Sequence, residues 1–131
     1  MSKVTLIGLD LAKSVFQVHG VNTEGKAILK KRLSRGQMLE FFAQLAPCIV
    51  AMEACSGSHY WGRKLTSLGH TPRLISPQYV KPFVRTNKND AADAAAIATA
   101  LVQPEMPIVP IKSAEQQAVL SIHRARSGLV K

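Results

Sequence analysis

Cysteine is scarce in this chain, and its two residues, Cys48 and Cys55, have no paired spacing. They form no C-x-x-C motif and no histidine pair accompanies them, so we predict no zinc site and expect two small core residues. No apolar run approaches the roughly 18 residues that a membrane span needs. The N-terminus also lacks a signal-peptide pattern. These absences favour a soluble, cytoplasmic protein with no membrane partner.

Acidic residues are also few. Eight Asp and Glu face 17 Lys and Arg, which gives a formal net charge of +9. The positive charges spread from Lys3 to Lys131 rather than gathering in one tail. Such an excess predicts a polyanionic partner, most simply DNA or another nucleic acid. The alternative is a soluble protein that is merely basic.

The chain has 131 residues, 47% of them hydrophobic, which is enough for one core. The apolar pattern predicts strands at 4–11, 16–21, 27–33, 48–52 and 71–75, and helices at 34–46, 56–68, 90–102 and from 113 onward. A short turn or helix is expected to start at Ser76 and Pro77.

The turn from Asn22 to Gly25 suits a hairpin between the second and third strands. Ser34 with Gln37, and Ser113 with Gln116, are capping boxes, and Leu39, Phe42 and Leu45 are expected on the apolar face of the helix at 34–46. Three prolines make 103–110 an extended connector. We therefore predict a catalytic domain at 1–103, and at 104–131 a proline-containing connector followed by the start of a helix.

Two predicted buried strands end in a carboxylate, Asp10 and Glu53. An unpaired buried carboxylate is costly, so each must cap a turn or meet a donor or a metal. Asp90 and Asp93 then open an Ala-rich helix and project from one face of its first turn. The simpler interpretation of this pair is two acids that complement the helix dipole.

The predicted order of strands and helices is that of a ribonuclease H-like α/β fold, a mixed sheet flanked by helices. Its first and fourth strands are adjacent and parallel, so Asp10 and Glu53 would be neighbours at their carboxyl ends, where α/β sheets bind ligands. The helix that carries Asp90 and Asp93 can pack across that edge. Four converging carboxylates suit a pair of Mg²⁺ ions roughly 4 Å apart, with Mn²⁺ as a substitute.

Three motifs carry a family resemblance. The segments Gly8–Lys13, Met52–Gly57 and Lys88–Ala94 together resemble the N-terminal RuvC-like domain of the DEDD transposases of insertion sequences, which are related to the pilin-gene invertases. The resemblance implies that Asp10, Glu53, Asp90 and Asp93 form the catalytic, Mg²⁺-binding tetrad for DNA strand cleavage and transfer in recombination.

The same resemblance implies partners and a further region. Family members act on DNA with a structured guide RNA, as oligomers, and carry a nucleophilic serine in a C-terminal domain. We therefore expect a downstream region beyond Lys131, without which strand exchange is incomplete. The helix from Ser113 has apolar positions at Val119, Ile122 and Leu129. Such a stripe needs a partner, so we expect this helix to support a homo-oligomer or to be poorly ordered.

Other functions remain open at this stage. A RuvC-like junction resolvase or a ribonuclease H-type nuclease would use the same carboxylates. Actin-like ATPases and sugar kinases also begin with Gly-x-Asp and a hairpin, but the second half and adenosine loop that they need are absent from these residues. An alternative from another class is a non-catalytic basic module that binds nucleic acid.

Several side chains flank the acids in sequence. Lys13, Arg85 and Lys88 are candidates for phosphate contacts, although a solvated basic face would look the same. The remaining candidates have a structural interpretation that we favour: core packing for His59, Tyr60 and Trp61 rather than base stacking, and helix capping for Ser56 and Ser58 rather than nucleophilic attack.

Overall fold

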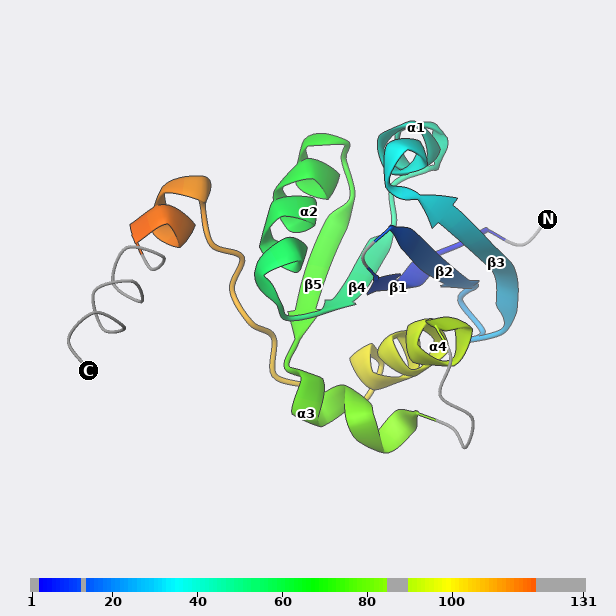
Figure 1. The fold of residues 1–131 in the computed structure, drawn as a ribbon. Helices are drawn as coiled ribbons and strands as arrows, with labels where there is room; N and C mark the ends of the chain where they lie inside the picture. Colours follow the sequence, from blue (N-terminus) through cyan, green and yellow to red (C-terminus); the bar gives the residue numbers. More distant parts are fainter. Residues whose placement is uncertain (1–2, 13, 85–89, 120–131) are drawn as a thin grey trace.

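The computed structural model describes residues 3–12, 14–84 and 90–119, with their side chains except those of residues 90 and 91. A five-stranded mixed sheet forms its centre, in the order β3-β2-β1-β4-β5 (Figure 1). Strands β1 and β4 and strands β4 and β5 pair in parallel, whereas β1, β2 and β3 form an antiparallel meander. The strands are β1 Leu6–Leu11, β2 Val15–Val21, β3 Ala27–Ser34, β4 Ile49–Glu53 and β5 Thr71–Ile75. The predicted strand order, with β1 beside β4, is confirmed.

The turn between β2 and β3 follows from Asn22 and Gly25. The side-chain oxygen of Asn22 accepts hydrogen bonds from the backbone N–H groups of Glu24 and Lys26, each at 3.0 Å. Gly25 adopts a φ of +80°, which a residue with a Cβ rarely takes. These local interactions reverse the chain and set the hairpin register.

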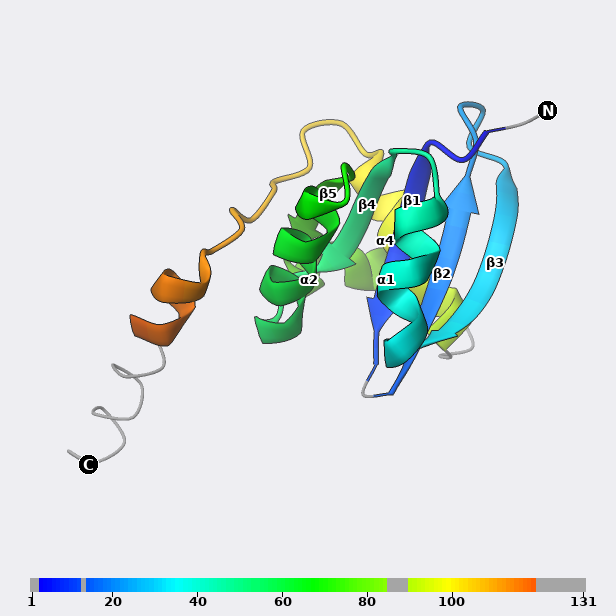
Figure 2. The ribbon, with the colours of Figure 1, turned by 90° about the horizontal axis from the view of Figure 1, so that it is seen from above.

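Helices cover both faces of the sheet. On one face lie α1 (Met38–Gln44) over the β1 and β2 side and α2 (Ser56–Ser67) over the β4 and β5 side (Figure 2). On the other lie α3 (Pro77–Val80) and α4 (Asp90–Leu101) (Figure 1). Because side chains alternate along a strand, β1, β2, β4 and β5 contribute to two separate cores, one under each helix layer, whereas β3 contributes only to the core under α1 and α2.

Helix α4 approaches β1 unusually closely. A Cβ atom on Gly8 would contact the backbone carbonyl of Ala94 and lie 2.7 Å from the backbone nitrogen of Ala98. Only glycine has no Cβ atom to occupy this space. The side chains of Ala94 and Ala98 in α4 are also small, which allows the helix to approach the strand. The contact holds the N-terminal half of α4 over the carboxyl end of β1.

Helix α1 differs in detail from the prediction. The capping box of Ser34 and Gln37 is confirmed, but it opens a 3₁₀ turn at Arg35–Gln37 before α1 begins at Met38. We expected Leu39 on the buried face, and this was wrong: Leu39 is 44% exposed, whereas Met38 is fully buried. The 3₁₀ turn rotates the following helix, because it has fewer residues per turn than an α-helix.

The expectation of two core cysteines holds only for Cys48, which is buried. Cys55 is exposed and is the N-cap residue of α2, a place that we had assigned to the serines after it. Residue 55 follows the last strand residue of β4 by two positions, so it lies in the turn at the end of the sheet rather than inside it.

The connector after α4 begins with a turn, in which the N–H of Met106 donates to the carbonyl of Gln103 at 3.4 Å and Glu105 has a φ of +59°. It is extended, as predicted, only from Met106 onward, where it lies against β5 and α2.

The backbone N–H of Val109 donates to the carbonyl of Leu74 at 2.8 Å. The guanidinium of Arg63 donates to the carbonyl of Lys112 at 2.6 Å, and the N–H of Lys112 donates to Nδ1 of His59 at 3.0 Å. These bonds tie the connector to the sheet domain. Whether a domain boundary falls at 103/104 stays a prediction.

The capping box of Ser113 and Gln116 is confirmed, with hydrogen bonds of 2.8 and 3.1 Å between the two residues. The helix that follows is described over 114–119, and Val119 is 48% exposed there. Ile122 and Leu129, the other apolar positions of its predicted stripe, lie outside the described residues. Within the described part of the chain, no helix is long and apolar enough to cross a membrane.

Candidate active site

Asp10 and Glu53 lie at matching positions of neighbouring parallel strands. In the register of β1 and β4, Gly8 pairs with Ala51 and Leu9 with Met52. Asp10 and Glu53 are the next residues of these strands, so they lie side by side. Leu9 and Met52 point into the core beneath α1 and α2. Alternation along the strands therefore directs both carboxylates to the opposite face, toward α4.

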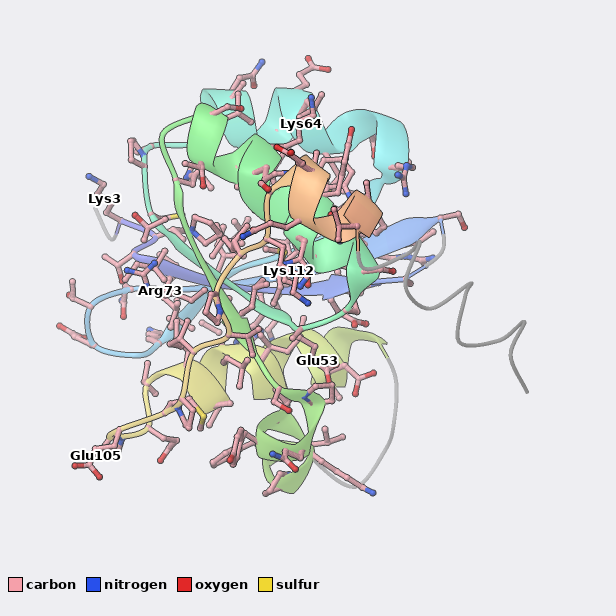
Figure 3. All side chains as sticks on the ribbon, turned by 90° about the vertical axis from the view of Figure 1, so that its left-hand side faces the viewer. Lys3, Glu53, Lys64, Arg73, Glu105 and Lys112 are labelled. Carbon is pink, nitrogen blue, oxygen red and sulfur yellow. The ribbon has the colours of Figure 1, made fainter. Side chains whose placement is uncertain are left out.

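The two acids line one cleft of about 210 Å³ at this end of the sheet, together with Leu11, Ala54, Cys55 and Pro77. Figure 3 shows Glu53 at the end of the sheet that faces α3 and α4. The cleft lies where the parallel strands end, which is the usual ligand position in open α/β sheets. Neither Cys55 nor Pro77 was a candidate from the sequence, since only the fold brings them to this edge.

The charge of Asp93, in α4, acts on Glu53. Burial, and in second place the negative charge of Asp93, raise the pKa of Glu53 above its ordinary value. The two carboxylates are therefore near enough for their charges to interact. The close packing of α4 on Gly8 explains this, because Asp93 immediately precedes Ala94 in that helix. Two of the four predicted acids, Asp10 and Glu53, thus share one cleft, and the charge of a third, Asp93, acts on Glu53.

The other predicted residues stand differently. The side chain of Asp90 lies outside the described ones, although the residue opens α4. Lys13, Arg85 and Lys88 lie outside the described residues altogether. Among the described residues, no three His, Cys, Asp or Glu side chains are arranged as a metal-binding group. The tetrad as a complete metal site therefore stays a prediction.

The favoured interpretations of residues near the cleft are largely confirmed. Ser58 is fully buried, and its hydroxyl accepts from the N–H of Cys55 at 2.9 Å and donates to the carbonyl of Cys55 at 2.8 Å. It therefore caps α2. His59 and Trp61 are buried, while Tyr60 is 38% exposed. Core packing is thus confirmed for Trp61, whereas the buried ring of His59 accepts a hydrogen bond from the connector and Tyr60 lies at the surface.

The fold is similar to that of a solved structure, RuvC of Thermus thermophilus. The similarity has a TM-score of 0.55 and 13% sequence identity, and covers 79% of this chain and 99% of the RuvC chain. At this identity it shows the fold alone. The ribonuclease H-like, RuvC-like α/β class predicted from the order of elements is confirmed.

Sequence comparison identifies the family. Residues 7–131 match the sequence pattern of the IS110-type DEDD family, whose description is "Transposase". The chain belongs to this transposase family. It is 59% identical over 125 residues to a "probable family 20 transposase" of Pseudomonas aeruginosa. The aligned residues cover 95% of this chain and 37% of that protein.

Two further relatives agree. The chain is 48% identical over its full length to the transposase for insertion sequence element IS1328 of Yersinia enterocolitica, covering 39% of that protein. It is 43% identical, again over its full length, to the transposase for insertion sequence element IS1111A of Coxiella burnetii, covering 36% of it. The chain therefore spans little more than a third of the length of the curated relatives that it matches.

Proposed function

We propose that this chain is the metal-dependent catalytic domain of an insertion-sequence transposase, in which Asp10, Glu53, Asp90 and Asp93 bind Mg²⁺ for DNA strand cleavage and transfer. The observation that supports it most is that Asp10 and Glu53 line one cleft at the end of the sheet. Asp10 and Glu53 end adjacent parallel strands, and the charge of Asp93 acts on Glu53 from α4.

The residues fit divalent cations. Carboxylate oxygens are the ligands that Mg²⁺ prefers, and Mn²⁺ accepts the same set. The raised pKa of Glu53 means that its charged form is disfavoured as the protein stands, and a cation among the acids would reverse this. When bound, the ions would stabilise charge at the attacking and leaving oxygens of a phosphodiester. The chain's own contribution is to hold the carboxylates on rigid strand ends and a packed helix.

The partners follow from charge and from the family. The net charge of +9 suits a nucleic acid, and transposases act on DNA. Lys13, Arg85 and Lys88 are proposed phosphate contacts, because they flank the acids in sequence. A structured guide RNA, a homo-oligomer and a cytoplasmic location belong to the same proposal and rest on the resemblance alone.

Metal titration tests the proposal. Mg²⁺ or Mn²⁺ should raise the thermal stability of the protein, by about 2.7 kcal/mol at a hundredfold excess over the dissociation constant. Asp10→Asn and Asp93→Asn should abolish the shift while leaving the fold intact. Glu40→Gln is the matched control, because Glu40 lies in α1 on the other side of the sheet. An equal shift in all four proteins would remove the proposal.

A junction resolvase or a ribonuclease H-type nuclease would pass the same metal test, and family membership favours the transposase. Cleavage assays separate the three with one set of substrates: insertion-sequence ends, a four-way DNA junction and an RNA–DNA hybrid. A non-catalytic basic module would bind these substrates without any metal-dependent cleavage.

A further inference from the structure

A second cleft opens beside the carboxylates, on the α4 face of the meander. Its volume is about 240 Å³, and Gln17, His19 and Lys30 line it together with Ala92 and Ala95 of α4. None of the strand residues in it was singled out by the sequence. Because both helix residues are alanines, α4 leaves the space above β2 and β3 unfilled.

The sheet register connects this cleft with the acids. Asp10 pairs with Gln17, and Gln17 pairs in turn with Arg32. The neighbouring row runs from Gly8 through His19 to Lys30. Two rows of paired residues therefore cross the sheet from β1 to its edge strand, β3. Each row spans two interstrand spacings, or about 10 Å.

These rows lie on the same face as the acids. Phe16 and Val18 alternate with the polar residues of β2 and are buried in the core beneath α1. Gln17 and His19 must then project to the other side, toward α4. On β3, Leu33 belongs to the same core, so Arg32 and Lys30 project with Gln17 and His19.

The end of each row is positive and the middle is polar. Lys30 and Arg32 are exposed. Burial and the charge of Lys30 lower the pKa of His19, so this ring is a neutral hydrogen-bonding group near pH 7. The only acidic residue between positions 14 and 37 is Glu24, at the far turn. Positive charge beside the acids is thus not neutralised by residues of the same hairpin.

We propose that a groove, made of the cleft of Gln17, His19 and Lys30 and of the exposed Arg32 that pairs with Gln17, binds the backbone phosphates of the nucleic-acid strand that reaches the carboxylates. Lys30 and Arg32 neutralise the phosphates, and Gln17 and His19 hydrogen-bond to the strand between them and Asp10. Arginine and lysine are the side chains best suited to phosphate oxygens. The inference rests on the proposed function for what happens at the acids, but the groove binds phosphate whether or not metal is present.

Charge removal on β3 tests it. In the full chain, Lys30→Gln with Arg32→Gln should weaken binding of fluorescent oligonucleotides roughly tenfold or more, since charge-assisted contacts are the strong ones. The slope of log affinity against log salt should decrease by about 1 for each lost phosphate contact. The measurement is repeated with single-stranded DNA, duplex DNA and single-stranded RNA. The nucleic acid whose affinity falls most in the variant is the one that the groove binds.

Lys31→Gln is the control, because it removes the same charge from the same strand on the opposite face. Its ammonium lies 5.2 Å from the centre of the Phe41 ring, under α1. The expected result is a salt slope like that of the unchanged protein. If Lys31→Gln weakens binding as much per charge as the groove variant does, only overall charge matters and the groove is refuted.

Metal titration of the groove variant separates this inference from the proposed function. A retained Mg²⁺-dependent thermal shift with weakened oligonucleotide binding supports both. Weakened binding in a protein that shows no metal shift at all supports the groove and refutes the metal site. Unchanged binding in the groove variant refutes the groove, whatever the metal titration shows.

Discussion

The backbone carbonyl of Ala94 occupies the place where a side chain on Gly8 would begin. This contact joins the two elements that carry the candidate active site. Asp10 follows Gly8 by two residues on β1, and Asp93 immediately precedes Ala94 on α4. The spacing between strand and helix therefore sets the spacing between their carboxylates.

Gly8→Ala should destabilise the protein by about 1–3 kcal/mol, because the new methyl group overpacks against backbone atoms that cannot rotate away. Urea unfolding measures the loss. The same variant should also weaken the Mg²⁺-dependent thermal shift, since α4 must move outward and take Asp93 with it.

Gly57→Ala provides the control. Gly57 lies in the first turn of α2, and an added Cβ would meet nothing within 4 Å. Alanine has the higher helix propensity, so this variant should be neutral or more stable by up to about 1 kcal/mol. Equal destabilisation by both substitutions would show that the contact with Ala94 is not what makes Gly8 necessary.

Glu53→Gln should stabilise the metal-free protein at pH 7. The folded pKa of Glu53 is raised, by burial first and then by Asp93, above its ordinary value of 4.5. The charged form therefore opposes folding, and this penalty grows as pH rises from the unfolded pKa through the folded one. Melting curves of both proteins from pH 3.5 to pH 7 should coincide at the acid end and separate as pH rises.

Divalent metal should reverse this order. With saturating Mg²⁺, the unchanged protein should gain stability and Glu53→Gln should gain little. A variant that is less stable than the unchanged protein at pH 7 without metal would mean that Glu53 makes a structural contact worth more than its repulsion.

His70→Ala should destabilise the fold strongly. Nδ1 of the buried ring accepts a hydrogen bond from the backbone N–H of Cys48 at 3.2 Å. The ring proton is therefore on Nε2, which donates to the carbonyl of Phe42 at 2.6 Å. Its removal leaves two buried backbone groups without these partners, at about 1–3 kcal/mol each. Chemical denaturation checks this, and a loss below 1 kcal/mol would indicate that water takes over both bonds.

Arg63→Ala should loosen the connector without unfolding the sheet. The guanidinium of Arg63 donates to the carbonyl of Lys112 and to the side-chain oxygen of Gln117, at 2.6 and 2.8 Å. Lys112 lies beside α2 in Figure 3. Hydrogen exchange over 109–117 should become faster while that of β1 and β4 is unchanged. Lys64→Ala is the control, since Lys64 instead lies over the ring of Tyr60.

Local rules were enough to predict much of this protein from its sequence. The alternation of apolar residues, the turn at Asn22 and the capping boxes at Ser34 and Ser113 depend on neighbours within a few positions. The strand order followed from the succession of elements, and with it the adjacent placement of Asp10 and Glu53. The acids stood out because a carboxylate at the end of a buried strand needs a specific reason.

Tertiary structure alone decided the rest, because it depends on contacts between distant segments. The family resemblance grouped Asp93 with Glu53, but local sequence rules do not bring its charge to Glu53; that requires α4 to pack on Gly8. The rotation of α1 that exposes Leu39 arises from a 3₁₀ turn, whose cost is recovered only by burying Met38 in the assembled core. Likewise, Lys30 and Arg32 of β3 share a face with the carboxylates only because Leu33 packs into the core on the opposite face. One residue of register would exchange Lys30 and Arg32 for Lys31, and the sheet as a whole fixes that register.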